Sequence, residues 1–197
     1  MPKDIPLDPV RMERARQMLL DTTEALDAAG VVYHLEGGTL LGIVRDGDLL
    51  PWDKDTDLSV MSSSIEAFWN DVRPRLLAKG WRVTRYTLDS DQPAWKKGDR
   101  RRFKVATRRF HFWPGDLYLD IFVKYRHDGH VWWQAKKKVM RVPERHYLGH
   151  DVVPYRGRML KAPQDHEGYL ATKFGNWRVP VKEWDCAKDE KTVVGDA

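Results

Sequence analysis

Three aspartates spaced by two residues stand where an apolar stretch of this chain begins. Asp53, Asp55 and Asp57 lead into residues 58–61, which are mostly apolar. Successive side chains of a β-strand point to opposite faces, so the three carboxylates share one face if the strand extends far enough back. Carboxylates crowded into a partly dry site repel each other unless a cation lies between them or one keeps its proton. Because oxygen ligands favour hard divalent ions, the pattern indicates a site for Mg²⁺ or Mn²⁺.

A fourth aspartate, Asp120, stands alone among large apolar residues in segment 117–125. In a strand, Tyr118, Asp120, Phe122 and Lys124 share one face, and Leu117, Leu119, Ile121 and Val123 share the other. A carboxylate buried there without a partner would cost several kcal/mol. A neighbouring arginine is one possible partner in so basic a chain, and a cation shared with Asp55 and Asp57 is the other. We favour the shared cation because of the spaced aspartates upstream, and we predict that Asp55, Asp57 and Asp120 are metal ligands.

A phosphate site is predicted beside the metal site. The glycine pair Gly37 and Gly38, followed by Thr39, lets the backbone approach a phosphate closely. A short helix over residues 39–44 would offer free N–H groups to that phosphate. Arg45, at the end of this helix, contacts a phosphate or holds a carboxylate in place, and the two roles are equally open.

Two further side chains complete the predicted site. Asp53, just outside the Asp55 and Asp57 pair, would orient or deprotonate an acceptor hydroxyl. Lys173 reaches a phosphate, or it is an ordinary solvated lysine on a helix. Aspartates in such loops also serve as turn and capping residues. That explanation does not account for aspartates that continue into a strand, where Asp is normally depleted, so catalytic roles for Asp53, Asp55, Asp57 and Asp120 are the better prediction.

The string GGTLLGIVRDGDLLPWDKDTDLSV, residues 37–60, resembles the signature of the LicD/fukutin-related family. Leu119-Asp120-Ile121, the segment 161–163 before a helix, and the closing element 169–177 are also similar to that family, so the resemblance extends over residues 34–180. It implies an α+β fold of the nucleotidyltransferase type, with a small mixed β-sheet and helices packed on it. It also implies transfer of a phospho-alcohol, such as phosphocholine or ribitol phosphate, from a CDP-linked donor to a sugar hydroxyl with release of CMP.

Two other functions remain as alternatives. A conventional nucleotidyltransferase would use the same carboxylates to pass on a nucleotide from a nucleoside triphosphate and release pyrophosphate. A nucleic-acid-binding module would be built around residues 96–109, which carry eight basic side chains. Nucleic acid is the less favoured partner, because the acidic cluster would repel a phosphate backbone. The basic run itself is expected to be a solvated edge strand, with steering of an anionic donor or acceptor as the second interpretation.

Composition limits the remaining possibilities. The 197 residues suit a single domain over 1–197, with a core at 8–180 and a loose charged tail at 186–197. A net charge of +5 favours anionic partners, here a CDP-linked donor together with a saccharide or glycoconjugate acceptor. A single cysteine, Cys186, excludes an internal disulfide and suits a reducing cytoplasm. No apolar run long enough for a membrane span and no leader pattern is visible, so we expect a cytoplasmic protein.

The remaining elements follow from periodicity and breakers. Asp8 and Pro9 begin an amphipathic helix that ends before Gly30. Strands are expected at 31–35 and 81–87, a loop at 89–99, and a hairpin turn at 127–130. A helix from residue 63 to residue 80 should kink or break near Pro74. A last helix is expected to begin at Pro163 and to end at Gly175.

Overall fold

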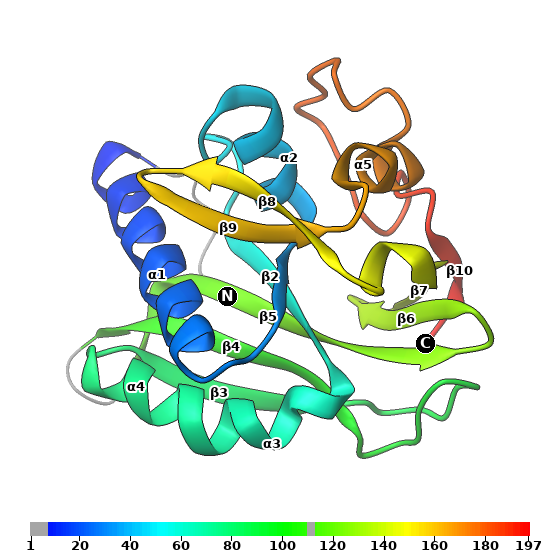
Figure 1. Cartoon of the computed structure of the whole chain (residues 1–197), viewed down its shortest axis with the longest axis horizontal. Coiled ribbons are helices and arrows are strands. Elements are labelled where there is room, and N and C mark those ends of the chain that lie inside the picture. The colour runs from blue at the N-terminus through cyan, green and yellow to red at the C-terminus, as the bar shows by residue number, and fades with distance from the viewer. Residues whose placement is uncertain (1–7, 110–112) are drawn as a thin grey trace.

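The computed structural model describes residues 8–109 and 113–197 (Figure 1). An eight-stranded sheet has the order β1-β2-β5-β6-β7-β10, with β4 beside β5 and β3 beside β4. Its strands are β1 (Tyr33–Leu35), β2 (Thr56–Met61), β3 (Arg82–Thr87), β4 (Arg100–Arg109), β5 (Trp113–His127), β6 (His130–Ala135), β7 (Lys138–Pro143) and β10 (Val193–Asp196). A separate hairpin is formed by β8 (His150–Tyr155) and β9 (Arg158–Pro163). The β2–β5 pair is parallel and the other strand pairs are antiparallel, which confirms the predicted mixed sheet.

Helices cover both faces of this sheet. They are α1 (Pro9–Ala28), α2 (Gly37–Asp46), α3 (Ile65–Ala67), α4 (Arg73–Ala78) and α5 (His166–Phe174). Helix α1 begins as predicted, because Asp8 accepts hydrogen bonds from the backbone N–H groups of Val10 and Arg11 at 2.9 Å and Pro9 occupies the first turn. Its buried face contacts β5 (Figure 1). These packed helices confirm the predicted α+β class.

The helical segment after β2 continues without a gap from residue 65 to residue 78, but it changes type just before Pro74. A π-helical turn, Phe68–Val72, separates α3 from α4. Pro74 lies in the first turn of α4, directly after the π-helical turn, and a proline inside a helix removes one backbone hydrogen bond. Phe68 of the π-helical turn is buried and stacks on Phe103 of β4, with ring centroids 4.0 Å apart. The π-helical turn therefore contributes an aromatic side chain to the core.

Strand β5 is the central element and carries two kinds of side chain. Leu117, Leu119, Ile121 and Val123 are buried in the apolar core, as the alternation predicts. Asp120 and Lys124, on the opposite face, are also buried. Because β5 runs between β2 and β4, its polar side chains lie beside those of both neighbours.

The expectation that the basic run forms an edge strand is wrong. Strand β4, which contains most of the run, pairs with both β3 and β5. The edge belongs instead to β3, where Arg85 is exposed. Charged side chains on β3 discourage pairing with another chain.

Two boundaries near the carboxyl terminus also differ from the prediction. Pro163 ends β9, and α5 begins only at His166 with Asp165 as its cap, whereas Gly175 ends the helix as expected. The tail is not loose, because β10 pairs with β7 and Glu190 and Thr192 are buried. The charged residues of the tail led to the prediction of a solvated segment. In the structure, Glu190 pairs with buried Lys173, and Thr192 donates to Glu190.

Candidate active site

Three of the four predicted aspartates converge at the junction of β2 and β5. The parallel register places Asp57 directly beside Asp120, and Asp55 immediately precedes β2. One carboxylate oxygen from each of Asp55, Asp57 and Asp120 lies within 4.8 Å of the other two. The structure therefore brings together the three side chains predicted to bind a metal, and their role as ligands stays a prediction.

Burial and mutual repulsion shift the pKa values of these groups upward. Burial, followed by the charges of Asp53 and Asp120, raises the pKa of Asp55 to about 7. Burial and then the charges of Asp55 and Asp120 raise the pKa of Asp57 well above its ordinary value. Burial also raises the pKa of Asp53. Without a cation, the cluster therefore holds protons near neutral pH.

Asp120 has the arginine partner that the sequence left open and a lysine beside it, while its share in a cation stays a prediction. Nη1 of Arg102 donates to its Oδ2 at 2.6 Å, and Nζ of Lys104 lies 3.6 Å from its Oδ1. Even so, Oδ1 is buried without a hydrogen-bond donor, and burial outweighs the two cations so that the pKa of Asp120 is raised. An oxygen-only cluster with one unsatisfied buried oxygen suits a hard divalent ion.

The glycine pair is required by the aspartates themselves. A Cβ atom on Gly38 would lie 1.9 Å from Oδ2 of Asp53, and one on Gly37 would lie 2.7 Å from Oδ2 of Asp57. Gly37 also has a φ of 52°, which side-chain-bearing residues rarely adopt. Both carboxylates therefore pack directly against the start of α2.

Helix α2 begins at Gly37, two residues earlier than expected. Thr39, predicted to face a phosphate, is buried, and its Oγ1 accepts a hydrogen bond from the backbone N–H of Asp57 at 2.8 Å. Its side chain therefore holds β2 against α2 instead of facing the pocket. Gly37 and Gly38 do line the pocket.

A buried carboxylate that sequence reasoning missed lies directly behind the aspartates. Glu36 precedes the glycine pair, and its backbone N–H donates to the carbonyl of Asp57 at 3.0 Å. Its carboxylate contacts five donors: Ser59 Oγ at 2.8 Å, Lys124 Nζ at 2.6 Å, Tyr169 Oη at 2.6 Å, Lys173 Nζ at 3.5 Å, and Tyr147 Oη. Burial opposes ionisation, but the charges of Lys124 and Lys173 outweigh it and lower the pKa of Glu36.

The two lysines of this network are buried with it. Burial lowers the pKa of Lys124 to about 8, although Glu36 favours its charged form. Lys173 is also buried, so the expectation of a solvated helix lysine is wrong, and it pairs with Glu190 at 3.1 Å as well as with Glu36. One sequence feature pointed to this network: Lys124 shares a strand face with Asp120, which was predicted to lie in the site. The other partners of Glu36 come from distant segments, so the sequence carried no signal for them.

Arg45 takes the second of its two predicted roles, but not with a clustered aspartate. Its Nε and Nη2 donate to Asp46 at 2.8 Å, and its Nη1 donates to the carbonyl of Trp177 at 3.5 Å. Arg45 and Lys173 both line the pocket, so their predicted contact with a phosphate stays a prediction.

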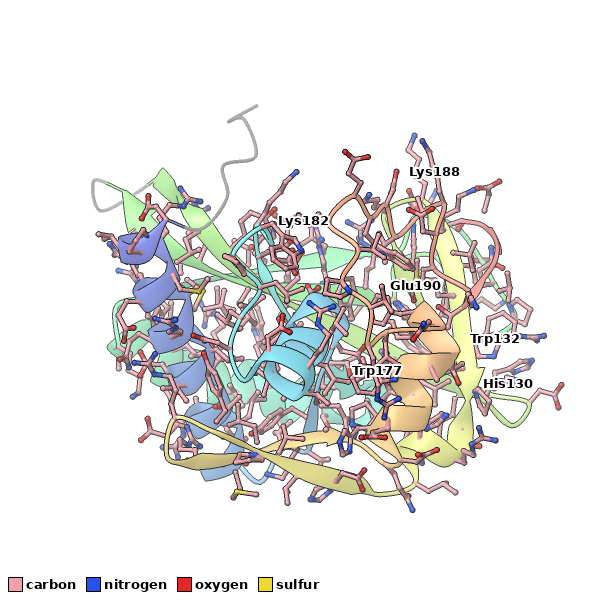
Figure 2. The ribbon with its side chains drawn as sticks, turned by 90° about the horizontal axis from the view of Figure 1, so that it is seen from above. His130, Trp132, Trp177, Lys182, Lys188 and Glu190 are labelled. Carbon is pink, nitrogen blue, oxygen red and sulfur yellow. The ribbon has the colours of Figure 1, made fainter. Side chains whose placement is uncertain are left out.

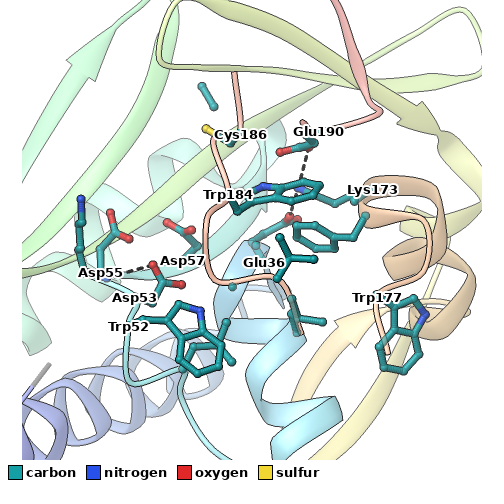
Figure 3. A pocket seen from close by; sticks show the side chains of 18 of the residues that line it. Glu36, Trp52, Asp53, Asp55, Asp57, Lys173, Trp177, Trp184, Cys186 and Glu190 are labelled. Carbon is teal, nitrogen blue, oxygen red and sulfur yellow. Dashed lines mark hydrogen bonds and ion pairs between the residues drawn. The ribbon is translucent and has the colours of Figure 1, made fainter. Parts of the chain in front are cut away.

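These groups surround a pocket of about 600 Å³ (Figure 3). Its lining includes the four predicted aspartates and the tryptophans Trp52, Trp133, Trp177 and Trp184. Much of one wall comes from residues 174–190, which include the start of the tail that was predicted to be loose. Figure 2 shows this segment from above, with Trp177, Lys182 and Glu190 beside α2 and α5. In the part of the chain that the structure describes, no helix is long and apolar enough to cross a membrane.

Comparison with known proteins gives one family match and several relatives. Residues 30–165 match the family model described as LicD/FKTN/FKRP, nucleotidyltransferase domain. Ribitol 5-phosphate transferase FKRP of Mus musculus is 32% identical over 157 residues, which are 76% of this chain and 29% of the relative. Ribitol-5-phosphate transferase FKTN of Homo sapiens is 26% identical over 190 residues, which are 91% of this chain and 36% of the relative. The chain thus spans about a third of the length of these relatives.

Two solved structures are also similar. The lincomycin-bound lincosamide antibiotic adenylyltransferase LnuA has a TM-score of 0.47 at 15% identity, with 78% of this chain and 83% of that chain covered. The antibiotic-resistance factor ANT(2'')-Ia has a TM-score of 0.49 at 16% identity, with 87% and 79% covered.

We predict that Gly38→Ala disrupts the site while leaving most of the fold in place. The new Cβ would overlap Oδ2 of Asp53, so that carboxylate or the start of α2 must move. The measurements are a crystal structure of the variant and divalent-ion binding by calorimetry. Gly195→Ala is the control, because a Cβ there meets no atom within 4 Å. Ion binding that is equal in both variants would contradict the close packing described here.

Loss of the Asp55 carboxylate is expected to stabilise the metal-free protein at alkaline pH. The pKa of Asp55 is about 7 in the folded protein, against roughly 3.9 for an unfolded aspartate. The folded state therefore holds a proton that the unfolded state releases, and stability falls as pH rises through this window. At pH 8 in a chelator, Asp55→Asn should melt at least about 2–4 °C above the wild type, the shift that 1 kcal/mol gives in a chain of this size.

The matched measurements use Mg²⁺ and Mn²⁺. Either ion should raise the melting temperature of the wild type more at pH 8 than at pH 6, because it competes with protons for the carboxylates. Asp55→Asn should lose most of this gain. Asp71→Asn, at an exposed position, is the control and should behave like the wild type. Equal melting of wild type and Asp55→Asn at pH 8 without metal would refute the repulsion.

Removal of the Glu36 charge should destabilise the fold strongly. Glu36→Gln leaves the ammonium groups of Lys124 and Lys173 buried with less compensation, at a cost of roughly 3–5 kcal/mol. Urea unfolding measures this loss. The double variant Glu36→Gln/Lys124→Met removes one of the unpaired charges, so it should recover part of the stability. A double variant no more stable than the single one would show that the ion pair is not the cause.

Proposed function

Because the chain belongs to the LicD/FKTN/FKRP nucleotidyltransferase-domain family, we propose that it transfers a phospho-alcohol, such as phosphocholine or ribitol phosphate, from a CDP-linked donor to a sugar hydroxyl. The family match confirms the resemblance found in residues 37–60 and the predicted nucleotidyltransferase type of fold. The acceptor would be a saccharide or glycoconjugate. The observation that carries the proposal is the convergence of Asp55, Asp57 and Asp120 beside the glycine pair at the start of α2.

Asp55, Asp57 and Asp120 would hold Mg²⁺ or Mn²⁺, as their all-oxygen donor set and the unsatisfied Oδ1 of Asp120 favour. The bound ion would neutralise negative charge on the phosphates. The backbone N–H groups at the start of α2, next to Gly37 and Gly38, would receive a donor phosphate. Lys173 would add positive charge from the other side of the pocket, and Arg45 would do so from the far end of α2.

The transfer step follows from the chemistry of a CDP-alcohol. The acceptor hydroxyl oxygen forms a bond to the phosphorus that carries the alcohol, and the bond from that phosphorus to the bridging oxygen breaks. CMP leaves with the electron pair, and the hydroxyl proton passes to a carboxylate. Asp53 suits this role because it lines the pocket beside the cluster and because burial raises its pKa, which makes it a stronger base.

Nucleotidyl transfer is the second candidate, favoured by the nucleotidyltransferase description of the matching family. The same carboxylates would then assist attack of the acceptor on a nucleoside triphosphate. The attacked phosphorus would be the one bonded to the nucleoside, and pyrophosphate would leave. The two reactions differ in the product released, so product analysis separates them.

We expect the wild type to release CMP from a CDP-alcohol in the presence of Mg²⁺ or Mn²⁺. The test incubates the protein with CDP-ribitol, CDP-choline, CDP-glycerol or nucleoside triphosphates, together with saccharide acceptors, and separates the products by chromatography. Asp57→Asn should lower turnover by at least about a thousandfold, because charge stabilisation supplies much of the rate in phosphoryl transfer. Circular dichroism should show that the variant remains folded.

Asp71→Asn is again the control, because its exposed side chain lies outside the pocket. Pyrophosphate release from a nucleoside triphosphate, with no CMP from any CDP-alcohol, would replace the proposal by the second candidate. Turnover by Asp57→Asn near that of the wild type would remove Asp57 from the scheme.

A further inference from the structure

A long loop of the carboxyl-terminal segment forms one rim of the pocket. Residues 176–189 leave helix α5 and return to the body of the protein at Glu190. At the base of this loop, the backbone N–H of Lys191 donates to the carbonyl of Lys173 at 3.1 Å, and the side chain of Lys173 pairs with Glu190. Compact surface loops whose ends meet in this way are frequently functional. We call residues 176–189 the rim loop.

The middle of the rim loop has few attachments to the rest of the protein. In the part of the chain that the structure describes, the backbone-to-backbone hydrogen bonds of residues 178–189 all stay within the loop. Residues 178–183 are exposed, and the ion pair of Arg178 with Glu167 of α5 has both side chains more than half exposed. Segments with few buried contacts open at a low cost in free energy. The rim loop can therefore move about a base that the buried ion network holds in place.

Two side-chain contacts reach from the rim loop to other sides of the pocket. The Nζ of Lys182 lies 5.8 Å from the centre of the Trp52 ring, in the segment between α2 and β2. Asp185 pairs with Lys136, between β6 and β7, at 2.7 Å, and these side chains are 39% and 58% exposed. Exposed contacts of both kinds contribute little to stability. They hold the loop across the pocket and are weak enough to break when a ligand enters.

Two valines of the rim loop lack the cover that apolar side chains usually have. Val179 and Val181 line the pocket, yet they are 55% and 52% exposed. Covering apolar surface is favourable, so an inward movement of the loop onto a bound ligand would be stabilised by these side chains. The loop therefore has weak contacts that keep it in place without a ligand and apolar surface that favours closure over one.

We propose that the rim loop is a lid, which opens to admit the CDP-linked donor and closes over it, with Lys182 against Trp52 as the closing contact. This inference rests on the proposed function, in which the donor phosphates lie among the aspartates at the start of α2. Trp52 directly precedes Asp53, so the closing contact lies beside the proposed base. Closure there would exclude water from the attacked phosphorus and leave the acceptor hydroxyl as the nucleophile.

Two rates measure the opening of the lid. Thiol labelling of Cys186, the single cysteine of the chain, reports on a half-buried side chain that lines the pocket. Trypsin cleavage after Arg178 or Lys188 reports on exposed lid residues outside the pocket, which a ligand in the pocket does not cover. CDP-choline, CDP-ribitol or CDP-glycerol with Mg²⁺, at about ten times its dissociation constant, should slow both rates about tenfold. Cleavage after Lys97, exposed between β3 and β4, is the internal control and should not change.

A variant of the closing contact separates a lid from a fixed wall. Lys182→Ala should speed Cys186 labelling of the ligand-free protein about two- to fivefold, the size of one exposed cation–π contact. It should also raise CMP release without acceptor relative to release with acceptor, because water then reaches the donor. Lys188→Ala is the matched control, since it removes the same charge from an exposed lid position outside the pocket, and it should label like the wild type. Cleavage after Arg178 that a bound donor does not slow, or equal labelling of Lys182→Ala and wild type, would overturn the lid.

The outcomes separate this inference from the function on which it rests. If CDP-alcohols yield CMP while the bound donor changes neither rate, the lid alone is wrong. If no CDP-alcohol yields CMP but a nucleoside triphosphate with Mg²⁺ slows both rates, the lid is supported and the proposed donor is wrong. If no nucleotide of either class binds, both proposals fail.

Discussion

Repulsion among carboxylates clustered at the junction of two adjacent parallel strands is the constraint to which the rest of the site responds. Asp57 and Asp120 are neighbours in the sheet register, and Asp55 completes a cluster whose oxygens lie within 4.8 Å of one another. Like charges at such separations in a poorly solvated site are costly, and the raised pKa values of Asp55 and Asp57 are the direct result. A protein keeps such an arrangement where the charge is used, which is typical of functional sites. In the proposed function, this negative charge would hold a cation beside the donor phosphates.

The surroundings limit the cost in different ways on each side of the cluster. On the β4 side, Arg102 pairs with Asp120 directly, and Lys104 adds a second positive charge. On the α2 side, the missing Cβ atoms of Gly37 and Gly38 allow Asp53 and Asp57 to pack against the backbone at the start of the helix. The free N–H groups and the dipole of a helix start favour negative charge there. Basic side chains and helix geometry thus act on the same carboxylates.

Behind the cluster, a second set of buried charges is balanced within itself. Glu36 and Glu190 face Lys124 and Lys173, and two tyrosine hydroxyls and Ser59 complete the hydrogen bonding of Glu36. A buried ion network of this kind is weak evidence for stability. Removing one partner is destabilising, however, because it leaves a buried charge unpaired. The network joins the start of α2, the middle of β5, helix α5 and the carboxyl-terminal segment. It thereby fixes the pocket wall relative to the aspartates.

The sequence alone determined the features whose cause is local. Alternation along 117–125 predicted the two faces of β5, and aspartates spaced by two predicted the carboxylate cluster, because strand geometry acts over a few residues. Near Pro74 the sequence predicted a kink or break, whereas the helix continues through a π-helical turn. Tertiary structure decided what depends on distant neighbours. The interior position of β4, the pairing of β10 with β7, and the burial of Lys173 and Glu36 all arise from segments far apart in the chain. A basic side chain reads the same in a sequence whether it faces water or pairs with a buried carboxylate. Only the fold brings that carboxylate next to it.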